Sequence, residues 1–288
     1  MKEKNQYLLG ANVSITVGFF KAIEEGTQIG CTAIQIFTKS NRQWHARSIT
    51  DNDAQEFITA QKNSDITIVV AHASYLINLG SVTPDVQKKS FTALVDEIKR
   101  CQKLQIPFLV LHPGTAEPDT REQTIKETGT LINQALQATS DCTTTVLIET
   151  MAGQGKSIGS SFEELATMLD QVSDKKRIGI CFDTCHAFAA GYDFRTQEDY
   201  DAMFKKFDNT IGLQYLRIFH LNDSKKEIAS HVDRHEDIGK GAINLQAFAM
   251  ILNDPRLKNV PKILETPVTG IAVDDYKRNL NILINLIK

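Results

Sequence analysis

Short runs of aliphatic and β-branched residues recur along the chain, separated by longer segments in which apolar residues return every three or four positions. A continuous apolar run is typical of a strand buried on both faces, as in a parallel sheet, whereas the longer period indicates an amphipathic helix. The sequence contains eight such runs: YLLGANV, CTAIQIF, ITIVVAH, IPFLVLH, TTVLIE, RIGICFD, YLRIFHL and VPKILE. Each is followed by enough residues for a loop and a helix.

Two of the intervening segments show the helical face clearly. One lies between the third and fourth runs and the other before the sixth. Their apolar positions are Phe91, Leu94, Val95, Ile98, Cys101 and Leu104 in the first, and Phe162, Leu165, Met168, Leu169 and Val172 in the second. Eight strand–helix units are the number that closes a (β/α)8 barrel. We therefore predict an α/β fold, a TIM barrel that forms a single domain over residues 1–288, with an open doubly wound sheet as the alternative.

Composition narrows the class of protein. A hydrophobic fraction of 42% suits a large core, and five cysteines without a CxxC pairing are typical of reduced thiols in a cytoplasmic protein. The polar opening MKEKNQ does not resemble a secretory signal, and we find no apolar run long enough for a membrane span. The formal charge of −3, taken alone, argues mildly against a nucleic-acid partner.

Side chains that commonly bind metals stand at the ends of six consecutive predicted strands. The carboxyl ends of barrel strands converge on one mouth, where barrel enzymes keep their chemistry. Further residues of these types follow the sixth strand and lie in the loop after the seventh. The nine candidates are His72, His112, Glu149, Asp183, His186, His220, Asp233, His235 and Glu265. A single histidine after an apolar run is usually structural, but five of the chain's seven histidines fall in this set, so we predict a metal site at the mouth.

The size of the set indicates more than one metal ion. One catalytic zinc takes three or four protein ligands, so nine candidates favour two or three ions that share carboxylates. Imidazole and carboxylate together suit zinc, with manganese or iron as alternatives. Cys181 and Cys185 flank Asp183 and are predicted to be packing residues. Divalent ions about 4 Å apart are suited to displacement at phosphorus, so phosphoester hydrolysis is the leading chemistry.

Several long motifs resemble the endonuclease IV family, zinc-dependent apurinic/apyrimidinic endonucleases of DNA base-excision repair with a xylose isomerase-like barrel. The resemblance covers essentially the whole chain. The motifs are FTKSNRQW at 37–44, HASYLINLG at 72–80, LHPG at 111–114, GICFDTCHAFAAGYD at 179–193, HLNDSK at 220–225, DRHEDIG at 233–239 and ILETP at 263–267.

The resemblance implies three zinc ions and assigns ligands to each. Glu149 would bridge two ions, and Glu265 would also orient the attacking hydroxide, so these two are the expected catalytic residues. The first ion would add His72 and His112, the second Asp183, His220 and Glu265, and the third His186, Asp233 and His235. The implied reaction is hydrolysis of the phosphodiester 5′ to an abasic site, which leaves a 3′-hydroxyl, together with a 3′-repair phosphodiesterase activity.

The resemblance also implies the partner, double-stranded DNA with abasic sites or 3′-blocked ends. A compact barrel with an exposed rim needs no partner subunit, so we expect a monomer, cytoplasmic and associated with the nucleoid when it acts on DNA. Arg42, Tyr75 and Leu76 would enter the base stack, and wedges of this kind unstack and bend DNA. Cations expected around the rim could contact phosphates: Lys39, Arg42, Arg47, Lys156, Lys225, Lys226, Arg234 and Lys240.

Three positions depart from the family pattern. Asn12 stands where a histidine is expected and Val17 where a glycine is expected, and Ala229 also replaces a glycine. None belongs to the nine candidates. The histidine expected at position 12 would lie under the metal site, so its loss bears on support of the site or on DNA positioning rather than on the reaction, and Ala229 leaves the conformation of its loop open.

Two other classes of function remain open on the sequence. A sugar isomerase or epimerase uses the same barrel with fewer metal ligands. A DNA-damage binder without catalysis is the other class, and the intact set of nine candidates disfavours it.

Overall fold

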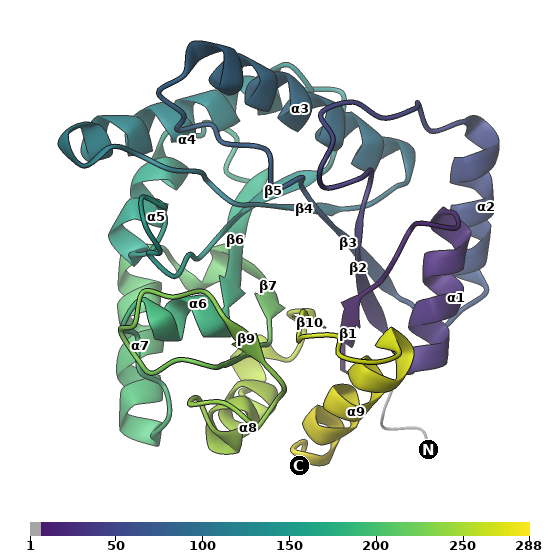
Figure 1. Ribbon diagram of the computed structural model, residues 1–288, viewed down its shortest axis with the longest axis vertical. Coiled ribbons are helices and arrows are strands. Elements are labelled where there is room, and N and C mark those ends of the chain that lie inside the picture. The colour runs from purple at the N-terminus through teal and green to yellow at the C-terminus, as the bar shows by residue number, and fades with distance from the viewer. Residues whose placement is uncertain (1–6) are drawn as a thin grey trace.

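The structure is a computed structural model that describes residues 7–288, so the opening MKEKNQ lies outside the described residues. Eight parallel strands form a closed barrel in the order β1-β10-β7-β6-β5-β4-β3-β2 (Figure 1). They are β1 (Leu9–Asn12), β2 (Ala33–Phe37), β3 (Ile68–His72), β4 (Phe108–Leu111), β5 (Thr145–Glu149), β6 (Ile178–Asp183), β7 (Leu216–His220) and β10 (Lys262–Leu264). The barrel prediction is confirmed and the open-sheet alternative is wrong, because β1 pairs with both β2 and β10.

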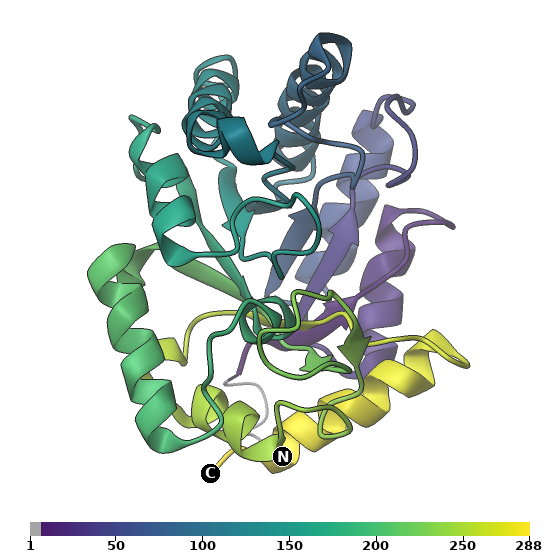
Figure 2. The same ribbon diagram turned by 60° about the vertical axis from the view of Figure 1, so that its left-hand side comes forward.

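Helices surround the barrel on its outside (Figures 1 and 2). They are α1 (Phe19–Ile29), α2 (Asp51–Lys62), α3 (Pro84–Lys103), α4 (Arg121–Gln137), α5 (Phe162–Asp170), α6 (Thr184–Ala189), α7 (Gln197–Thr210), α8 (Leu245–Asn253) and α9 (Ala272–Asn285). Local sequence sets several of their ends: Thr50 and Asp53 form a capping box at α2, and Ser161 caps α5. Among the described helices, none combines the length and apolarity needed to cross a bilayer.

The loop after β7 carries a small antiparallel ribbon, β8 (Asp223–Ser224) with β9 (His235–Glu236). Its base is organised by the buried carboxylate of Asp223, which accepts hydrogen bonds from the backbone N–H groups of Ser224, Gly239, Gly241 and Ile243 at 2.8–3.0 Å. A buried carboxylate is costly unless donors surround it, and here all four come from one loop. Asp223 therefore fixes the loop that carries Asp233 and His235.

Hydrophobic packing divides the core into two parts. The larger part lies between the strands and the helices, and includes the apolar face predicted for α3 and α5. The smaller part fills the barrel itself. Its buried members are Ala33, Val70, Val110, Leu147, Cys181, Ile218 and Ile263, one from each of seven strands. The barrel interior is thus a packed plug, which closes the floor beneath the mouth.

Candidate metal centre

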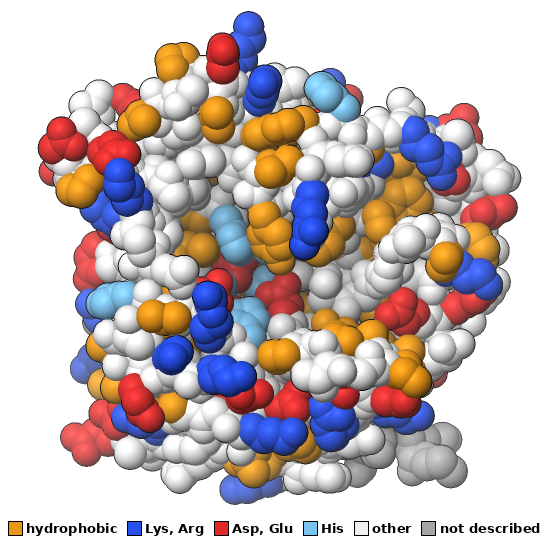
Figure 3. All heavy atoms as spheres, viewed as in Figure 1, with side chains coloured by type: hydrophobic (Ala, Val, Ile, Leu, Met, Phe, Trp, Pro, Cys, Tyr) orange, Lys and Arg blue, Asp and Glu red, His pale blue; other side chains and the backbone are white. Residues whose placement is uncertain are grey.

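All nine candidate side chains meet at the carboxyl ends of the barrel strands. Figure 3 shows histidine and acidic side chains gathered in a hollow at the centre of this face, with lysine and arginine around it. Within the described residues, atoms able to bind a metal lie within 4.8 Å of one another in four overlapping groups. The groups are His72, His112 and Glu149; Glu149, Asp183, His220 and Glu265; Asp183, His186 and His235; and Cys185, Asp233 and His235.

Glu149 is the common member of the first two groups and is fully buried. Its Oε2 lies 3.2 Å from His72 Nε2 and 3.0 Å from His112 Nε2. Its Oε1 lies 3.0 Å from His220 Nδ1 on the other side. The two carboxylate oxygens therefore face different histidines, which is the geometry of a carboxylate that can bridge two cations.

The second group is assembled by Asn222, which the sequence analysis did not select. Its side-chain amide donates to Asp183 Oδ2 at 2.7 Å, and its Oδ1 accepts from the backbone N–H of Glu265 at 2.8 Å. A β-bulge at Ile180 and Cys181 shifts the register between β6 and β7, so that Asp183 stands level with His220. Glu265 Oε2 then lies 3.1 Å from His220 Nδ1.

The third and fourth groups share His235 and lie toward the loop after β7. His186 Nε2 is 3.2 Å from Asp233 Oδ2, and His235 Nε2 is 3.4 Å from Asp233 Oδ1. Asp183 caps α6 by accepting from the backbone N–H of His186 at 2.8 Å. One carboxylate thus sits beside His220 and also fixes the turn that carries His186, which explains why a buried strand ends on an acid three residues before a histidine.

Four of the histidines have one ring nitrogen committed to a backbone carbonyl or to the side-chain carbonyl of Gln35. A carbonyl oxygen can only accept, so the nitrogen facing it must carry the proton and the other nitrogen is free to bind a metal. The bonds run from His72 Nδ1 to Ala73 O at 2.7 Å, His186 Nδ1 to Thr150 O at 2.9 Å, His235 Nδ1 to Glu265 O at 3.1 Å, and His220 Nε2 to Gln35 Oε1 at 2.8 Å.

Gln35 is the second residue that the sequence analysis missed. It is fully buried on β2, and its Nε2 donates to Glu265 Oε1 at 2.6 Å while its Oε1 accepts from His220. The amide therefore orients two candidate ligands at once. A signal was present, because glutamine is the one polar residue in the apolar run AIQIF.

The cluster fits a bound cation. His186 Nε2 and His235 Nε2 are buried and make no hydrogen bond, an arrangement that costs free energy unless a further group satisfies them. Burial opposes charge on His186, but Asp183 and Asp233 raise its pKa well above the usual value. Burial likewise opposes charge on Glu149, yet His220 and His112 hold its pKa well below the usual range. A divalent cation would supply the positive charge that protons otherwise provide, and nitrogen with oxygen ligands suits zinc, manganese or iron.

The two cysteines beside Asp183 differ in their surroundings. Cys181 lies in the apolar plug, as predicted for a packing residue. Cys185 is also buried, but its thiol belongs to the group with Asp233 and His235. Burial raises the pKa of each thiol to about 12, so neither is a thiolate at neutral pH in the metal-free protein.

The predicted DNA-side residues lie at the edge of the same hollow. Tyr75 is half exposed, with its ring centroid 5.3 Å from that of His112, and Leu76 beside it is partly buried. Arg42 is exposed on the neighbouring loop.

The expectation that Lys39 is a rim cation is wrong. Its side chain is 1% exposed and pairs with Asp96 at 2.9 Å, because it folds beneath its own loop. Lys156 and Lys240 do lie at the surface, but they pair with Glu117 and Asp237.

The three departures from the family pattern have different structural consequences. Asn12 stands beside Gln35 in the barrel, and its Oδ1 is buried without a hydrogen-bond partner. Val17 is largely exposed in the loop before α1. Ala229 keeps a left-handed conformation, φ 57°, and its N–H donates to Phe188 O at 3.2 Å. The loop therefore holds the backbone shape that glycine favours, at a cost of roughly 1 kcal/mol.

Comparison with known proteins identifies relatives over nearly the whole chain. A family model described as a xylose isomerase-like TIM barrel matches residues 23–286. Probable endonuclease 4 of Chloroflexus aggregans is 41% identical over 279 residues, 97% of each chain. That of Geobacter sulfurreducens is 42% identical over 284 residues, 99% of this chain and 95% of the relative.

Solved structures agree with these relatives. The crystal structure of endonuclease IV from Thermus thermophilus superposes with a TM-score of 0.84 at 33% identity, covering 96% of this chain and 98% of that one. A D-tagatose 3-epimerase-like protein has a TM-score of 0.73 at 20% identity, covering 96% of each chain, which shows a shared fold alone.

Proposed function

Because this chain belongs to the endonuclease IV family of xylose isomerase-like TIM barrels, we propose that it is a DNA-repair endonuclease that hydrolyses the phosphodiester 5′ to an abasic site and leaves a 3′-hydroxyl. One observation carries the proposal: Glu149 presents its two oxygens to different histidines at the mouth of the barrel. A site of this kind is suited to clustered cations and hence to phosphoester chemistry. Release of 3′-blocking groups by the same site is part of the proposal.

Three zinc ions are the proposed metal content. His72, His112 and Glu149 would hold the first ion, and Glu149 with Asp183, His220 and Glu265 the second. His186, Asp233 and His235 would hold the third. When bound, such a cluster activates water for attack and stabilises charge on the phosphate oxygens and the leaving group.

The residues of the chain position the reaction. Glu149 and Glu265 are the proposed catalytic residues. The bond from Gln35 to Glu265 Oε1 fixes that carboxylate, whose other oxygen faces His220 at 3.1 Å. Glu265 is then placed to orient the attacking water.

Recognition of the lesion is assigned to the loops beside the mouth. An abasic nucleotide flips out of the DNA helix at low cost, because it has no base to unstack. Tyr75, Leu76 and Arg42 are placed to fill the gap that remains in the base stack. The proposed partner is double-stranded DNA with abasic sites or 3′-blocked ends. The proposed working form is a cytoplasmic, nucleoid-associated monomer in which residues 1–288 make up one domain.

The test uses metal-replete protein and a duplex that carries one abasic analogue. The expected product is a single nick immediately 5′ to the lesion with a 3′-hydroxyl. Glu265→Gln should remove the nick, whereas Glu122→Gln, at an exposed position on α4, should leave it unchanged. Metal content is measured in all three proteins.

Inertness of the wild-type protein with about three metals per chain would overturn the assignment of substrate. Turnover of a free ketose without cleavage of DNA would support the sugar isomerase alternative. Tight binding of the abasic duplex without any nick would support a non-catalytic binder.

A further inference from the structure

Helix α3 buries two charged residues where its neighbours are apolar. Glu97 and Arg100 are 1% and 8% exposed, and they lie on the face that also buries Ala93, Leu94, Ile98 and Cys101. A buried charge is costly unless its partners are well placed, and apolar replacements of buried ion pairs are often neutral for stability. The partners of Glu97 and Arg100 therefore indicate the role of these two side chains.

Within residues 7–288, the hydrogen-bond and ion-pair partners of these two side chains all belong to one of two loops. The Glu97 carboxylate accepts from the Thr38 hydroxyl and from the Ser74 N–H at 3.3 Å, and Lys39 Nζ lies 3.6 Å away. Arg100 donates to Thr38 O and to Arg47 O, the latter at 2.9 Å.

These partners lie in the segments 38–50, which carries Arg42, and 73–83, which carries Tyr75 and Leu76. We call them the wedge loops. One turn of α3 thus holds the bases of both.

The wedge loops are also tied directly to each other. Ser74 Oγ donates to Asn41 O at 2.9 Å, next to Arg42, and accepts from the backbone N–H of Leu76 at 3.3 Å. The Phe37 ring lies 5.5 Å from the Tyr75 ring in an edge-on contact. Each of the three proposed wedge residues is therefore next to, bonded to or in contact with a residue at the base of the two loops, where α3 holds them.

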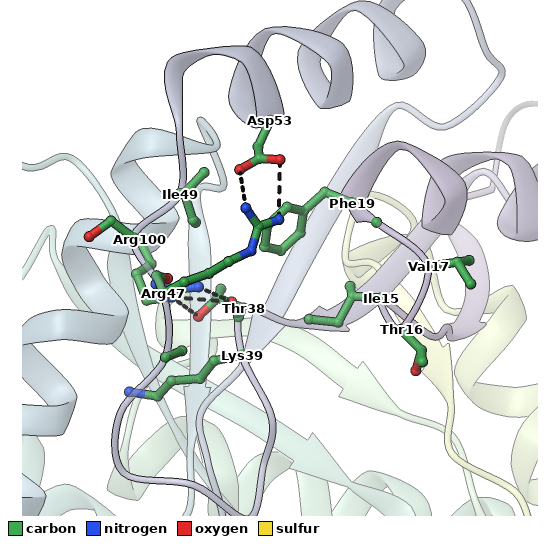
Figure 4. Close-up of a pocket in the computed structure, with 13 residues that line it drawn as sticks. Ile15, Thr16, Val17, Phe19, Thr38, Lys39, Arg47, Ile49, Asp53 and Arg100 are labelled. Atoms are coloured by element: carbon green, nitrogen blue, oxygen red, sulfur yellow. Dashed lines mark hydrogen bonds and ion pairs between the residues drawn. The ribbon is translucent and has the colours of Figure 1, made fainter.

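The first wedge loop also borders a cavity of about 420 Å³, which Arg100 of α3 lines as well (Figure 4). Thr38, Lys39 and Arg47 line it from the loop, and residues 15–18 with Phe19, the first residue of α1, line it from the amino-terminal side. Figure 4 shows Arg100 directed at Thr38 and the Arg47 side chain turned outward to Asp53. The contacts from α3, together with the Arg47–Asp53 ion pair, therefore fix the loop beside this cavity.

We infer that Glu97 and Arg100 are positioning residues that set Arg42 against Tyr75 and Leu76, so that the wedge loops enter damaged DNA as one rigid unit. The inference rests on the proposed function. Preorganisation lowers the ordering cost of binding, so loss of the brace weakens recognition of the lesion and leaves the chemical step intact.

Glu97→Gln tests this, because glutamine keeps the size and one acceptor but removes the charge. The expected result is a KM for the abasic duplex raised about tenfold, as for the loss of a hydrogen bond to a charged group, with kcat and metal content unchanged. Binding of abasic over intact duplex should fall by the same factor. Glu122→Gln is the control: it makes the same change at an exposed position of α4 that contacts neither wedge loop, and KM should stay as in the wild type.

Hydrogen exchange gives a readout that does not depend on cleavage. In Glu97→Gln, peptides from 38–50 and 73–83 should exchange faster together, and in Glu122→Gln they should not. If Glu97→Gln does not fold, Ser74→Ala, which cuts the direct tie between the loops, should show the same pattern of raised KM and faster exchange. Unchanged KM, discrimination and exchange in a folded variant would overturn the inference. A wild-type protein that does not nick abasic DNA would instead overturn the proposed function, and exchange would then still decide whether the loops move as one.

Discussion

Two layers of side chains inside the barrel are separated by only two residues along each strand, yet they have opposite chemistry. The lower layer is apolar, and consists of Ala33, Val70, Val110, Leu147, Cys181, Ile218 and Ile263. The upper layer is polar, and consists of Gln35, His72, His112, Glu149, Asp183, His220 and Glu265. Each upper residue follows its lower counterpart by one period of the strand, so both point into the barrel.

The difference shows that one layer of the barrel interior contributes to folding stability and the next layer provides the chemical groups of the site. The lower layer packs without polar groups and makes a dry floor. The upper layer gathers charges that are satisfied only by one another, by bonds such as those of Gln35 and Asn222, and by the cations they are proposed to hold. Substitutions in the upper layer should therefore affect cleavage, and substitutions in the lower layer should affect folding.

The sharpest test changes Glu149 in the upper layer. Glu149→Gln keeps the shape but removes the charge that faces His72, His112 and His220, so cleavage of an abasic duplex should fall by roughly 10³-fold, as for other losses of electrostatic stabilisation. Single-turnover nicking rates and metal content per chain measure this. A rate within tenfold of the wild type at full metal content would contradict the role of Glu149.

The companion change is Leu147→Ala, two residues earlier on β5. Because Leu147 is fully buried in the plug, the free energy of unfolding should fall by about 2–5 kcal/mol, as for other cavity-forming changes. Urea unfolding checks this, with the exposed Val82→Ala as the control that should change little. At 25 °C the folded variant should retain kcat; a loss as large as that of Glu149→Gln would mean that the layers are not separate.

Gln35 tests whether the upper layer depends on its supporting bonds. Gln35→Leu removes the contacts to His220 and Glu265, so zinc affinity should fall by about 10- to 100-fold, the usual cost of losing such support. Chelator competition measures it without reference to activity. Gln55→Leu, on the exposed side of α2, serves as control, and equal affinities in the two variants would show that Gln35 does not orient the ligands.

Lys262 adds a buried cation at the base of β10, one residue before Ile263. Burial lowers its pKa to about 8, and its ammonium donates to Leu257 O and Val260 O at 2.7 Å. Between about pH 8 and the ordinary value of 10.5 the unfolded chain keeps the proton and the folded chain does not, so stability from this group rises with pH across that window. The rise is at most about 1.4 kcal/mol per pH unit.

Urea unfolding of the wild type and Lys262→Met at several pH values between 7 and 10.5 isolates this contribution. The difference between the two proteins should change with pH above 8 and stay constant below it. A constant difference throughout would show that Lys262 keeps its ordinary pKa in the folded protein.

Local sequence patterns were enough to predict the eight barrel strands and the residues at their ends, although not the short ribbon of β8 and β9. The pleat has a period of two, so a run such as RIGICFD fixes where its last side chains point, and eight units leave few ways to cover both faces of a sheet. His72, Glu149, Asp183 and their partners were therefore predictable, as was their convergence on one mouth. The sequence also contained the signal for Gln35, whose polar side chain interrupts an apolar run.

The pairing of polar side chains could not be predicted in the same way, because it depends on contacts between distant parts of the chain. Gln35 and Glu265 are joined across 230 positions of the chain, and Glu97 meets Ser74 and Thr38 only because α3 lies over two neighbouring strands. Lys39 was predicted at the rim and is instead buried. Its ammonium group pairs with Asp96 and lies near Glu97, both on α3, and its position in a loop did not predict these contacts. The periodicity of apolar residues is a local property that can be identified in a short stretch of sequence. A hydrogen bond or an ion pair between distant residues forms only when barrel closure brings the two positions together.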